Sequence, residues 1–196
     1  MPRTPLQFQQ MKDERKLSIL ESALLLFAVH EKDSVSIDMI CQKAKCSHGL
    51  AYHYFKNVDQ IYEEIKRSNS YMELLPSLEV FDIEKEIYSQ LVNFVKKTTE
   101  VIKKSKTEVA LMSLIIADES KKSLYSTLLK VVAQGQNEGS LTGGNPSDIV
   151  STYYLFLKGI YQTYLNQKHP VIKVPSIDNI MQIFERWFFR IRRYIF

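Results

Sequence analysis

Residues 36–54 read SIDMICQKAKCSHGLAYHY, and this stretch predicts two short helices joined by a tight turn. Ser36 is placed to cap the first helix, because a serine hydroxyl can accept a hydrogen bond from the free N–H groups two or three residues later. Apolar side chains at positions 37, 40, 41 and 44 then recur at the spacing of one helical face. Ser47 offers a second cap, so the connection is no longer than three or four residues. The size and pattern are those of a DNA-binding helix-turn-helix.

The second of these helices has an apolar face and a polar face. The positions expected to point inward are Leu50, Ala51 and Phe55. The positions left on the outside are His48, Gly49, Tyr52 and His53. Small, hydrogen-bonding and aromatic side chains suit entry into a major groove, where acidic side chains would be repelled by phosphate.

The region around this motif resembles the DNA-binding head of the tetracycline-repressor-type (TetR) family of bacterial regulators. That family's pattern runs through Ala-x-x-Leu-Phe, a Thr or Ser cap, Ile-Ala, an Ala-Gly-Val-Ser turn and Gly-x-x-Tyr-x-(Tyr/His)-Phe. The matching residues here, within residues 15–65, are Ile19, Leu20, Ala23, Leu26, Phe27, Ser36, Ile40, Cys41, Ala44, Cys46, Ser47, Gly49, Tyr52, Tyr54, Phe55, Asp59 and Ile61.

Three departures from the family pattern have physical consequences. Lys45 replaces the turn glycine, so a non-glycine residue is expected to hold a left-handed conformation at a cost of about 1 kcal/mol. The glycine usual between the first two helices is missing from residues 30–33. Val58 replaces a lysine common at the start of the fourth helix, which makes Lys56 the nearest substitute for a phosphate contact.

Composition is compatible with a DNA partner. With 26 Lys and Arg against 22 Asp and Glu, the chain of 196 residues carries a net charge of +4. Two cysteines and a start unlike a signal peptide favour a reducing, cytoplasmic location. The longest apolar run, residues 23–29, is far shorter than the ~20 residues of a membrane span.

The helical periodicity along the chain predicts an all-α fold of about nine helices. We expect a three-helix DNA-binding head in residues 1–56 and a helical body in residues 57–196, with a connecting helix from Asn57 to about Leu75. Further helices are predicted over residues 82–104, 105–116, 120–134, 145–167 and from Ser176 onward. The resemblance implies that the body binds a regulatory ligand and dimerises.

The helix over residues 145–167 is apolar almost all round, and such a helix must be buried on every side. A monomer of this size cannot easily cover the outer faces of its last two helices. We therefore expect these helices to pair with their copies in a four-helix bundle across a two-fold axis, and the resemblance implies the same homodimer interface.

The predicted DNA contacts divide into two classes. The residues expected to position the head on phosphates are Ser36, Ser47, Tyr52 and Lys56, and those expected to approach base edges are His48, Gly49, Leu50 and His53. Near the start of the chain, Arg3, Lys12, Arg15 or Lys16 could also lie against the backbone. A dimer would read a palindromic operator of double-stranded DNA with half-sites about 34–36 Å apart.

The resemblance also implies a pocket for an unknown small-molecule effector. Its lining could come from Tyr88, Phe94, Met112, Tyr125, Tyr153, Phe156 and Tyr161. Any one of these side chains could equally be ordinary core.

Other kinds of site have less support. Cys41, Cys46, His48 and His53 are close in sequence, but the cysteines fall on the inward face and the histidines on the outward face, so no metal site is expected. Phosphate-binding and hydrolase motifs are missing, so we expect neither an enzyme nor a cofactor.

The sequence is thus interpreted as a homodimeric transcriptional repressor released by a ligand. The alternatives are a helical protein-interaction module and a membrane-associated protein using the basic, aromatic residues 185–196.

Overall fold

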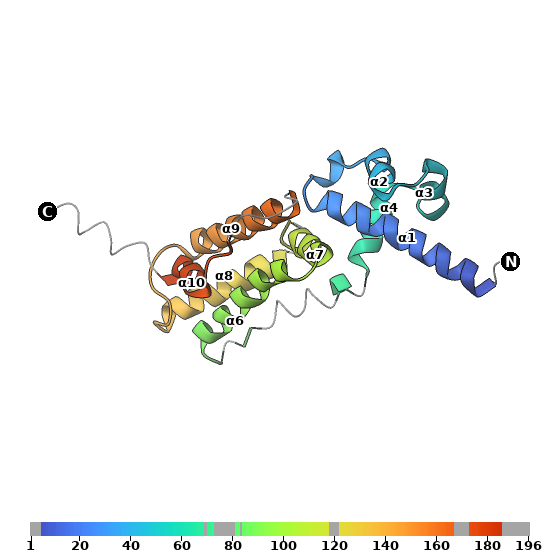
Figure 1. Ribbon diagram of the computed structural model, residues 1–196. Helices are drawn as coiled ribbons and strands as arrows, with labels where there is room; N and C mark the ends of the chain where they lie inside the picture. Colours follow the sequence, from blue (N-terminus) through green and yellow to red (C-terminus); the bar gives the residue numbers. More distant parts are fainter. Residues whose placement is uncertain are drawn as a thin grey trace. The chain divides into compact units, whose positions relative to one another are not determined.

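The computed structural model describes residues 5–68, 70–72, 81–82, 84–117, 122–166 and 173–185. Within these ranges the secondary structure is helical, which confirms the all-α prediction (Figure 1). The chain divides into two compact units, Met1–Met72 and Glu73–Phe196. We name the first unit the head and the second the body; the functional boundary expected after residue 56 stays a prediction.

The head consists of α1 (Pro5–Phe27), a 3-10 turn η1 (Lys32–Ser34), α2 (Ile37–Ala44), α3 (His48–Tyr54) and α4 (Val58–Lys66). The α1 helix packs against both α2 and α4. The core that joins them is mainly apolar and includes Ile19, Ala23, Ile40, Ala51, Phe55 and Ile61, each at most 1% exposed. Burial of these side chains stabilises the orientation of α2 and α3 by the hydrophobic effect.

The start of α4 agrees with the sequence, whereas its end does not. Asn57 Oδ1 accepts a hydrogen bond from Gln60 N at 2.8 Å and caps the helix, which confirms the predicted start. The prediction that this helix continues to about Leu75 is wrong, because α4 ends at Lys66. The hydroxyl of Ser68 accepts a hydrogen bond from Tyr71 N at 3.3 Å, so this serine caps a new turn instead of continuing the helix.

The body contains α6 (Ile87–Glu100), a 3-10 turn η2 (Val101–Lys103), α7 (Lys106–Ala117), α8 (Lys122–Asn137), α9 (Pro146–Asn166) and α10 (Ile177–Glu185). The α9 helix packs on α7 and α8, and α6 packs on α8 and α10 (Figure 1). All seven side chains from Val109 to Ile115 on α7 are buried. This stretch of α7 is therefore buried on all sides.

The predicted helix starts in the body are confirmed at three positions. Glu108 N donates to Ser105 Oγ at 3.2 Å, and Ser105 N donates to Glu108 Oε2 at 3.2 Å, a reciprocal capping box. Asn145 Oδ1 accepts from Ser147 N at 2.9 Å before α9. Ser176 Oγ accepts from Asn179 N at 3.4 Å before α10.

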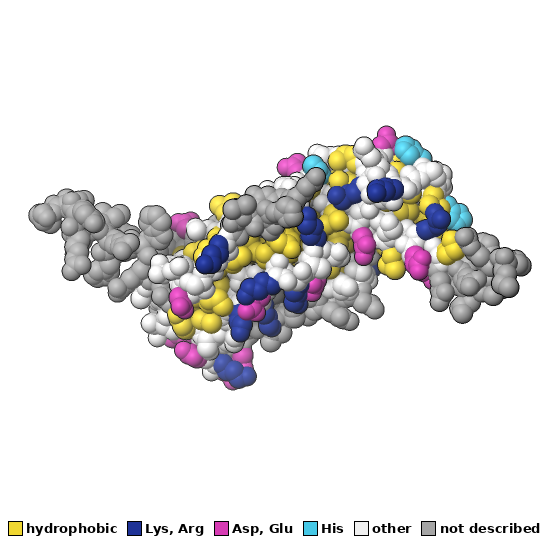
Figure 2. Space-filling view, viewed as in Figure 1, with side chains coloured by type: hydrophobic (Ala, Val, Ile, Leu, Met, Phe, Trp, Pro, Cys, Tyr) yellow, Lys and Arg dark blue, Asp and Glu magenta, His cyan; other side chains and the backbone are white. Residues whose placement is uncertain are grey.

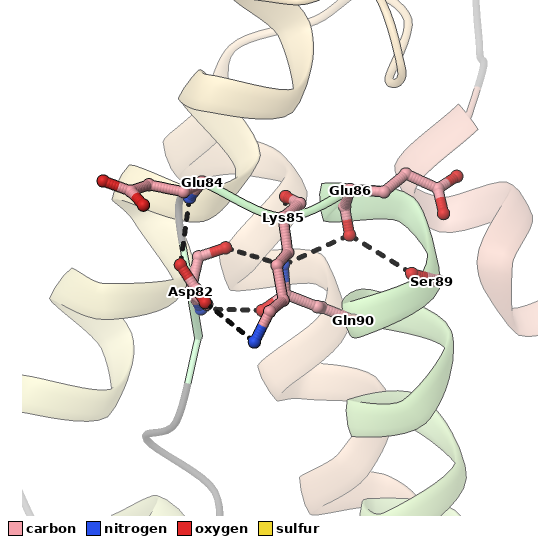
Figure 3. A network of polar contacts seen from close by, with 6 residues as sticks. All are labelled: Asp82, Glu84, Lys85, Glu86, Ser89 and Gln90. Atoms are coloured by element: carbon pink, nitrogen blue, oxygen red, sulfur yellow. Dashed lines mark hydrogen bonds and ion pairs between the residues drawn. The ribbon is translucent and has the colours of Figure 1, made fainter.

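The helix predicted from residue 82 begins instead at Ile87, because Gln90 holds the preceding turn (Figure 3). Gln90 Nε2 donates to the carbonyl oxygens of Asp82 at 2.8 Å and Lys85 at 3.2 Å, and Gln90 Oε1 accepts from Asp82 N at 2.7 Å. The Lys85 ammonium also pairs with the Asp82 carboxylate at 3.0 Å and lowers the pKa of that carboxyl group. These contacts fix a turn where the periodicity alone predicts helix.

No helix in the described part of the chain combines the length and hydropathy needed to cross a bilayer. The arginine- and aromatic-rich stretch from residue 186 lies outside the described residues.

Candidate nucleic-acid interface

The turn between α2 and α3 is a Schellman motif with a lysine at its left-handed position. Lys45 has φ 53° and ψ 45°, as the missing glycine predicted. Cys46 N donates to Cys41 O at 3.0 Å and Lys45 N donates to Gln42 O at 3.4 Å, which is the hydrogen-bond pair that defines the motif. These bonds end α2 abruptly, so that only three residues separate α2 from α3.

Both helices of the motif carry the predicted serine caps. Ser36 Oγ accepts a hydrogen bond from Met39 N at 3.2 Å, and Ser47 Oγ accepts one from Leu50 N at 3.3 Å. Because each hydroxyl acts as an acceptor in the cap, its own proton stays available for donation to a phosphate oxygen. Ser36 and Ser47 are both exposed, which such a contact requires.

The α3 helix has the two faces that the sequence predicted. Ala51 is fully buried and Phe55, which follows the helix, is 1% exposed. Tyr52 is 54% exposed, and His48, Gly49 and His53 are exposed as well. Leu50 was expected inward and is half-buried, so it lies at the edge between the two faces.

The outer face of α3 is open space. A Cβ atom built on Gly49 would meet no other atom within 4 Å, so packing within the chain does not demand glycine there. Lys43, Lys45 and Lys56 are exposed. Histidine side chains (cyan) and basic side chains (dark blue) lie at the surface around α2 and α3 (Figure 2).

One contact on this face was not predictable from the sequence. His48 Nε2 lies 3.3 Å from Asp38 Oδ1 on α2, an ion pair when the imidazole carries a proton. The two residues are ten positions apart on different helices, and no local pattern signals their approach.

The C-terminal end of α3 is held in place by Lys16, a residue that the sequence had suggested for contact with the DNA backbone. Lys16 on α1 pairs with Glu64 on α4 at 2.5 Å, and its ammonium lies 5.7 Å from the centre of the Phe55 ring. Lys16 therefore acts inside the head as a link between α1, α4 and the end of α3.

The cysteines and histidines of the motif differ in exposure. Cys41 is buried and Cys46 is half-buried, whereas His48 and His53 are exposed. Among the described residues, His, Cys, Asp and Glu side chains form no group of three or more that could hold a metal ion.

The seven effector candidates in the body do not form one cluster. Phe94 and Tyr153 lie 6.0 Å apart between ring centres, and Phe156 stacks on Tyr153 at 6.0 Å. Tyr125 belongs to a second group, where its ring meets Tyr154 at 5.4 Å. Phe94, Met112, Tyr153 and Tyr161 are at most 4% exposed, whereas Tyr88, Tyr125 and Phe156 are half-buried.

A buried polar group lies inside this aromatic core. The hydroxyls of Thr98 and Tyr153 are hydrogen-bonded to each other, and the Tyr161 hydroxyl donates to the Thr98 carbonyl oxygen. Burial raises the pKa of both tyrosines, so both keep their protons. The sequence carries no local signal for this contact, because Thr98 and Tyr153 are 55 positions apart.

Comparisons with known proteins agree with the geometry of the head. The sequence model of a family described as "Bacterial regulatory proteins, tetR family" matches residues 19–65, which run from the second half of α1 to the end of α4. A search of curated proteins found no match.

Solved structures with a similar fold cover most of the chain. A Clostridium perfringens protein named as a candidate fatty acid metabolism regulator has a TM-score of 0.55 at 15% identity, covering 85% of this chain and 96% of that one. A mutant of HlyIIR with one segment substituted by alanine has a TM-score of 0.59 at 15% identity, covering 90% and 99%. A TetR family transcriptional regulator from Pseudomonas syringae pv. tomato has a TM-score of 0.49 at 16% identity, covering 87% and 92%.

Proposed function

We propose that this protein is a homodimeric, cytoplasmic transcriptional repressor that a small molecule releases from its operator. The match of residues 19–65 to the sequence model of the tetR family of bacterial regulatory proteins supports this proposal. In this proposal residues 1–56 bind DNA, residues 57–196 bind the effector and dimerise, and α4 connects the two. The observation that carries it is the outer face of α3, where exposed His48, Tyr52 and His53 surround the open position of Gly49.

The DNA contacts follow from this face. Inserted in a major groove, α3 would bring His48, Gly49, Leu50 and His53 toward base edges. The residues that would contact phosphates are Ser36, Ser47, Tyr52 and Lys56, all of which are exposed.

Dimerisation through α9 and α10 is supported by apolar surface on α9. Leu155 is 70% exposed, and Tyr154, Phe156 and Ile160 are only half-buried. A Cβ atom on Gly159 would meet nothing within 4 Å, so a second helix can approach closely at that position. Hydrophobic side chains (yellow) reach the surface around α9 (Figure 2). A second copy of the chain would cover this surface.

The effector proposal rests on the aromatic core of the body. Phe94, Tyr153, Phe156 and Phe184 form a chain of ring contacts between α6, α9 and α10. An apolar ligand with a hydroxyl or carbonyl group would find ring surface there, and the hydroxyls of Thr98 and Tyr153 could bond to its polar end. In a dimer, such a ligand would change the spacing between the heads of the two subunits only to the extent that it binds one spacing more tightly than another.

The direct test measures operator binding by fluorescence anisotropy on DNA flanking the protein's own gene. The double variant Tyr52→Ala/His53→Ala is expected to lose binding while light scattering still reports a dimer, because both side chains are exposed. His30→Ala is the matched control, since His30 is an exposed histidine of the head outside α3, and it should bind as the wild type does. Unchanged binding by the double variant would refute the placement of α3.

Salt dependence separates this proposal from a protein-interaction module. A DNA-binding head that neutralises several phosphates loses affinity steeply as salt rises, because counterions are released on binding. Wild-type protein that shows no such slope on duplex DNA would favour the interaction module.

A further inference from the structure

The two cysteines of the chain occupy paired positions of the α2–α3 turn. In the Schellman motif the N–H of the second residue past the helix end bonds to the carbonyl of a residue in the last turn, and the side chains at these two positions usually touch. Here those positions are Cys46 and Cys41, joined by the 3.0 Å backbone bond from Cys46 N to Cys41 O. The turn therefore places the side chains of Cys41 and Cys46 next to each other.

The two thiols are neighbours but are not equally accessible. Cys46 is close enough to Cys41 to raise the pKa of the Cys41 thiol. Cys41 is 3% exposed, whereas Cys46 is half-buried. Burial, and then the nearby Cys46, raise the pKa of the Cys41 thiol to about 11, so Cys41 is a protonated thiol at neutral pH. An oxidant in solution reaches Cys46 first.

We propose that Cys41 and Cys46 are an oxidation site, at which a hydroperoxide closes an intramolecular disulfide that lowers the affinity of the head for DNA. The formation of the disulfide depends only on the geometry of the turn. The effect on DNA rests on the proposed function.

The reaction balances in two steps. The Cys46 thiolate attacks the outer oxygen of the hydroperoxide, so that an S–O bond forms, the O–O bond breaks and an alcohol or water leaves with the proton of Cys46. The Cys41 sulfur then attacks the Cys46 sulfenic sulfur, an S–S bond forms, the S–O bond breaks, and the departing hydroxide takes the Cys41 proton as water. Two thiols lose two electrons, and the hydroperoxide gains them.

The disulfide would act on α3 through the residue that starts it. A disulfide brings its sulfurs to about 2.05 Å, closer than two thiols that are not bonded, so closing it draws Cys46 toward α2. Ser47 is the next residue, and its hydroxyl caps α3 through Leu50 N. Displacing Ser47 weakens a cap and tilts the outer face of α3 away from the groove that it fits.

The site is tested first without DNA. Full-length protein is treated with hydrogen peroxide under native conditions, and free thiols are then alkylated in denaturant and counted by mass spectrometry. The expected product is a monomeric chain lighter by two hydrogen atoms with a peptide cross-link between Cys41 and Cys46. A cross-link between two chains on a non-reducing gel, or two thiols that remain alkylatable, would overturn the proposal.

The regulatory effect is tested on the same samples by anisotropy. Oxidised wild-type protein should bind operator DNA about tenfold more weakly than the reduced protein, with recovery after dithiothreitol, because a weaker cap and a tilt of α3 both reduce its fit to the groove. Cys46→Ser and Cys41→Ala should each bind equally with and without peroxide, because neither can form the disulfide. A disulfide that forms without weakening DNA binding would overturn the regulatory effect. Reduced protein that does not bind DNA would overturn the proposed function, but the proposal that the disulfide forms would not be affected.

Discussion

The imidazole of His48 on α3 lies 3.3 Å from the carboxylate of Asp38 on α2, so a negative charge stands beside the face that we propose for DNA. Both side chains are more than half exposed, and an exposed ion pair of this kind contributes only about 0–1 kcal/mol to stability. We expect Asp38→Asn to raise DNA affinity about two- to threefold at low salt, because it removes repulsion between a carboxylate and phosphate. Fluorescence anisotropy measures the DNA affinity, and urea denaturation measures the contribution of the ion pair to stability.

The matched control for this change is Glu31→Gln, which removes an exposed carboxylate of the head outside α2 and α3. It should alter affinity less than Asp38→Asn does. Weaker binding by Asp38→Asn would mean that the carboxylate orients the His48 imidazole for a base edge, and that this role outweighs its repulsion of phosphate.

Lys45 holds a left-handed conformation, with φ 53° and ψ 45°, that costs a residue with a Cβ about 1 kcal/mol. Lys45→Gly should therefore raise the free energy of unfolding by about 1 kcal/mol, as long as the αL turn is kept. Lys43→Gly is the matched control two residues earlier, inside α2, where glycine should destabilise by a similar amount. Urea denaturation measures both, and equal destabilisation by the two variants would contradict the strain at Lys45.

The sequence predicted the turns of the head well because the forces that fix them are local. Ser36, Ser47 and Asn57 each cap a helix within three residues of their own position. Lys45 was expected to be left-handed because it stands where the family resemblance places a turn glycine. These interactions depend on residues that are close in sequence, so they can be predicted from the sequence alone.

The predictions failed where a side chain forms a hydrogen bond or an ion pair with a group outside its own helix. Gln90 bonds back to Asp82 and delays α6 by five residues, and Ser68 ends the run of α4 that the apolar spacing favoured. The approach of His48 to Asp38 depends on how α2 and α3 cross. The aromatic residues of the body fall into two groups for the same reason, since periodicity gives the buried face but not the helix against which it packs.

Thr98 and Tyr153 share a hydrogen bond in the core of the body, where both are at most 1% exposed. Thr98→Val leaves the tyrosine hydroxyl buried without that partner, which should cost about 1–3 kcal/mol in the free energy of unfolding. Thr98→Val/Tyr153→Phe removes both polar groups, so its cost should be smaller than the sum of the single variants.

This double-mutant cycle is measured by urea denaturation of the four proteins. Tyr125→Phe is the control, because Tyr125 is only half-buried and its hydroxyl bonds to Ser151 Oγ at 2.9 Å near the surface. It should change stability little. Strict additivity of Thr98→Val and Tyr153→Phe would show that the two hydroxyls do not depend on each other.

Leu155 is 70% exposed on α9, which is more exposure than a large aliphatic side chain keeps without a reason when it is flanked by other apolar groups. If a second copy covers it, Leu155→Arg places a charge in an apolar interface, and light scattering at micromolar concentration should report a monomer where the wild type is a dimer. Leu17→Arg is the matched control, because Leu17 is 56% exposed on α1 of the head, outside the proposed interface, and this variant should stay dimeric.

The Leu155→Arg variant also has an expected effect on DNA binding. A dimer places two α3 helices on one operator, so the monomeric variant should bind a single half-site far more weakly than the dimer binds the palindrome. The affinity of one head for one half-site, and its dependence on salt, should be the same in the variant and the wild type. A wild-type monomer, or a Leu155→Arg variant that is still dimeric, would remove α9 as the interface and leave the exposed leucine to be explained by another partner.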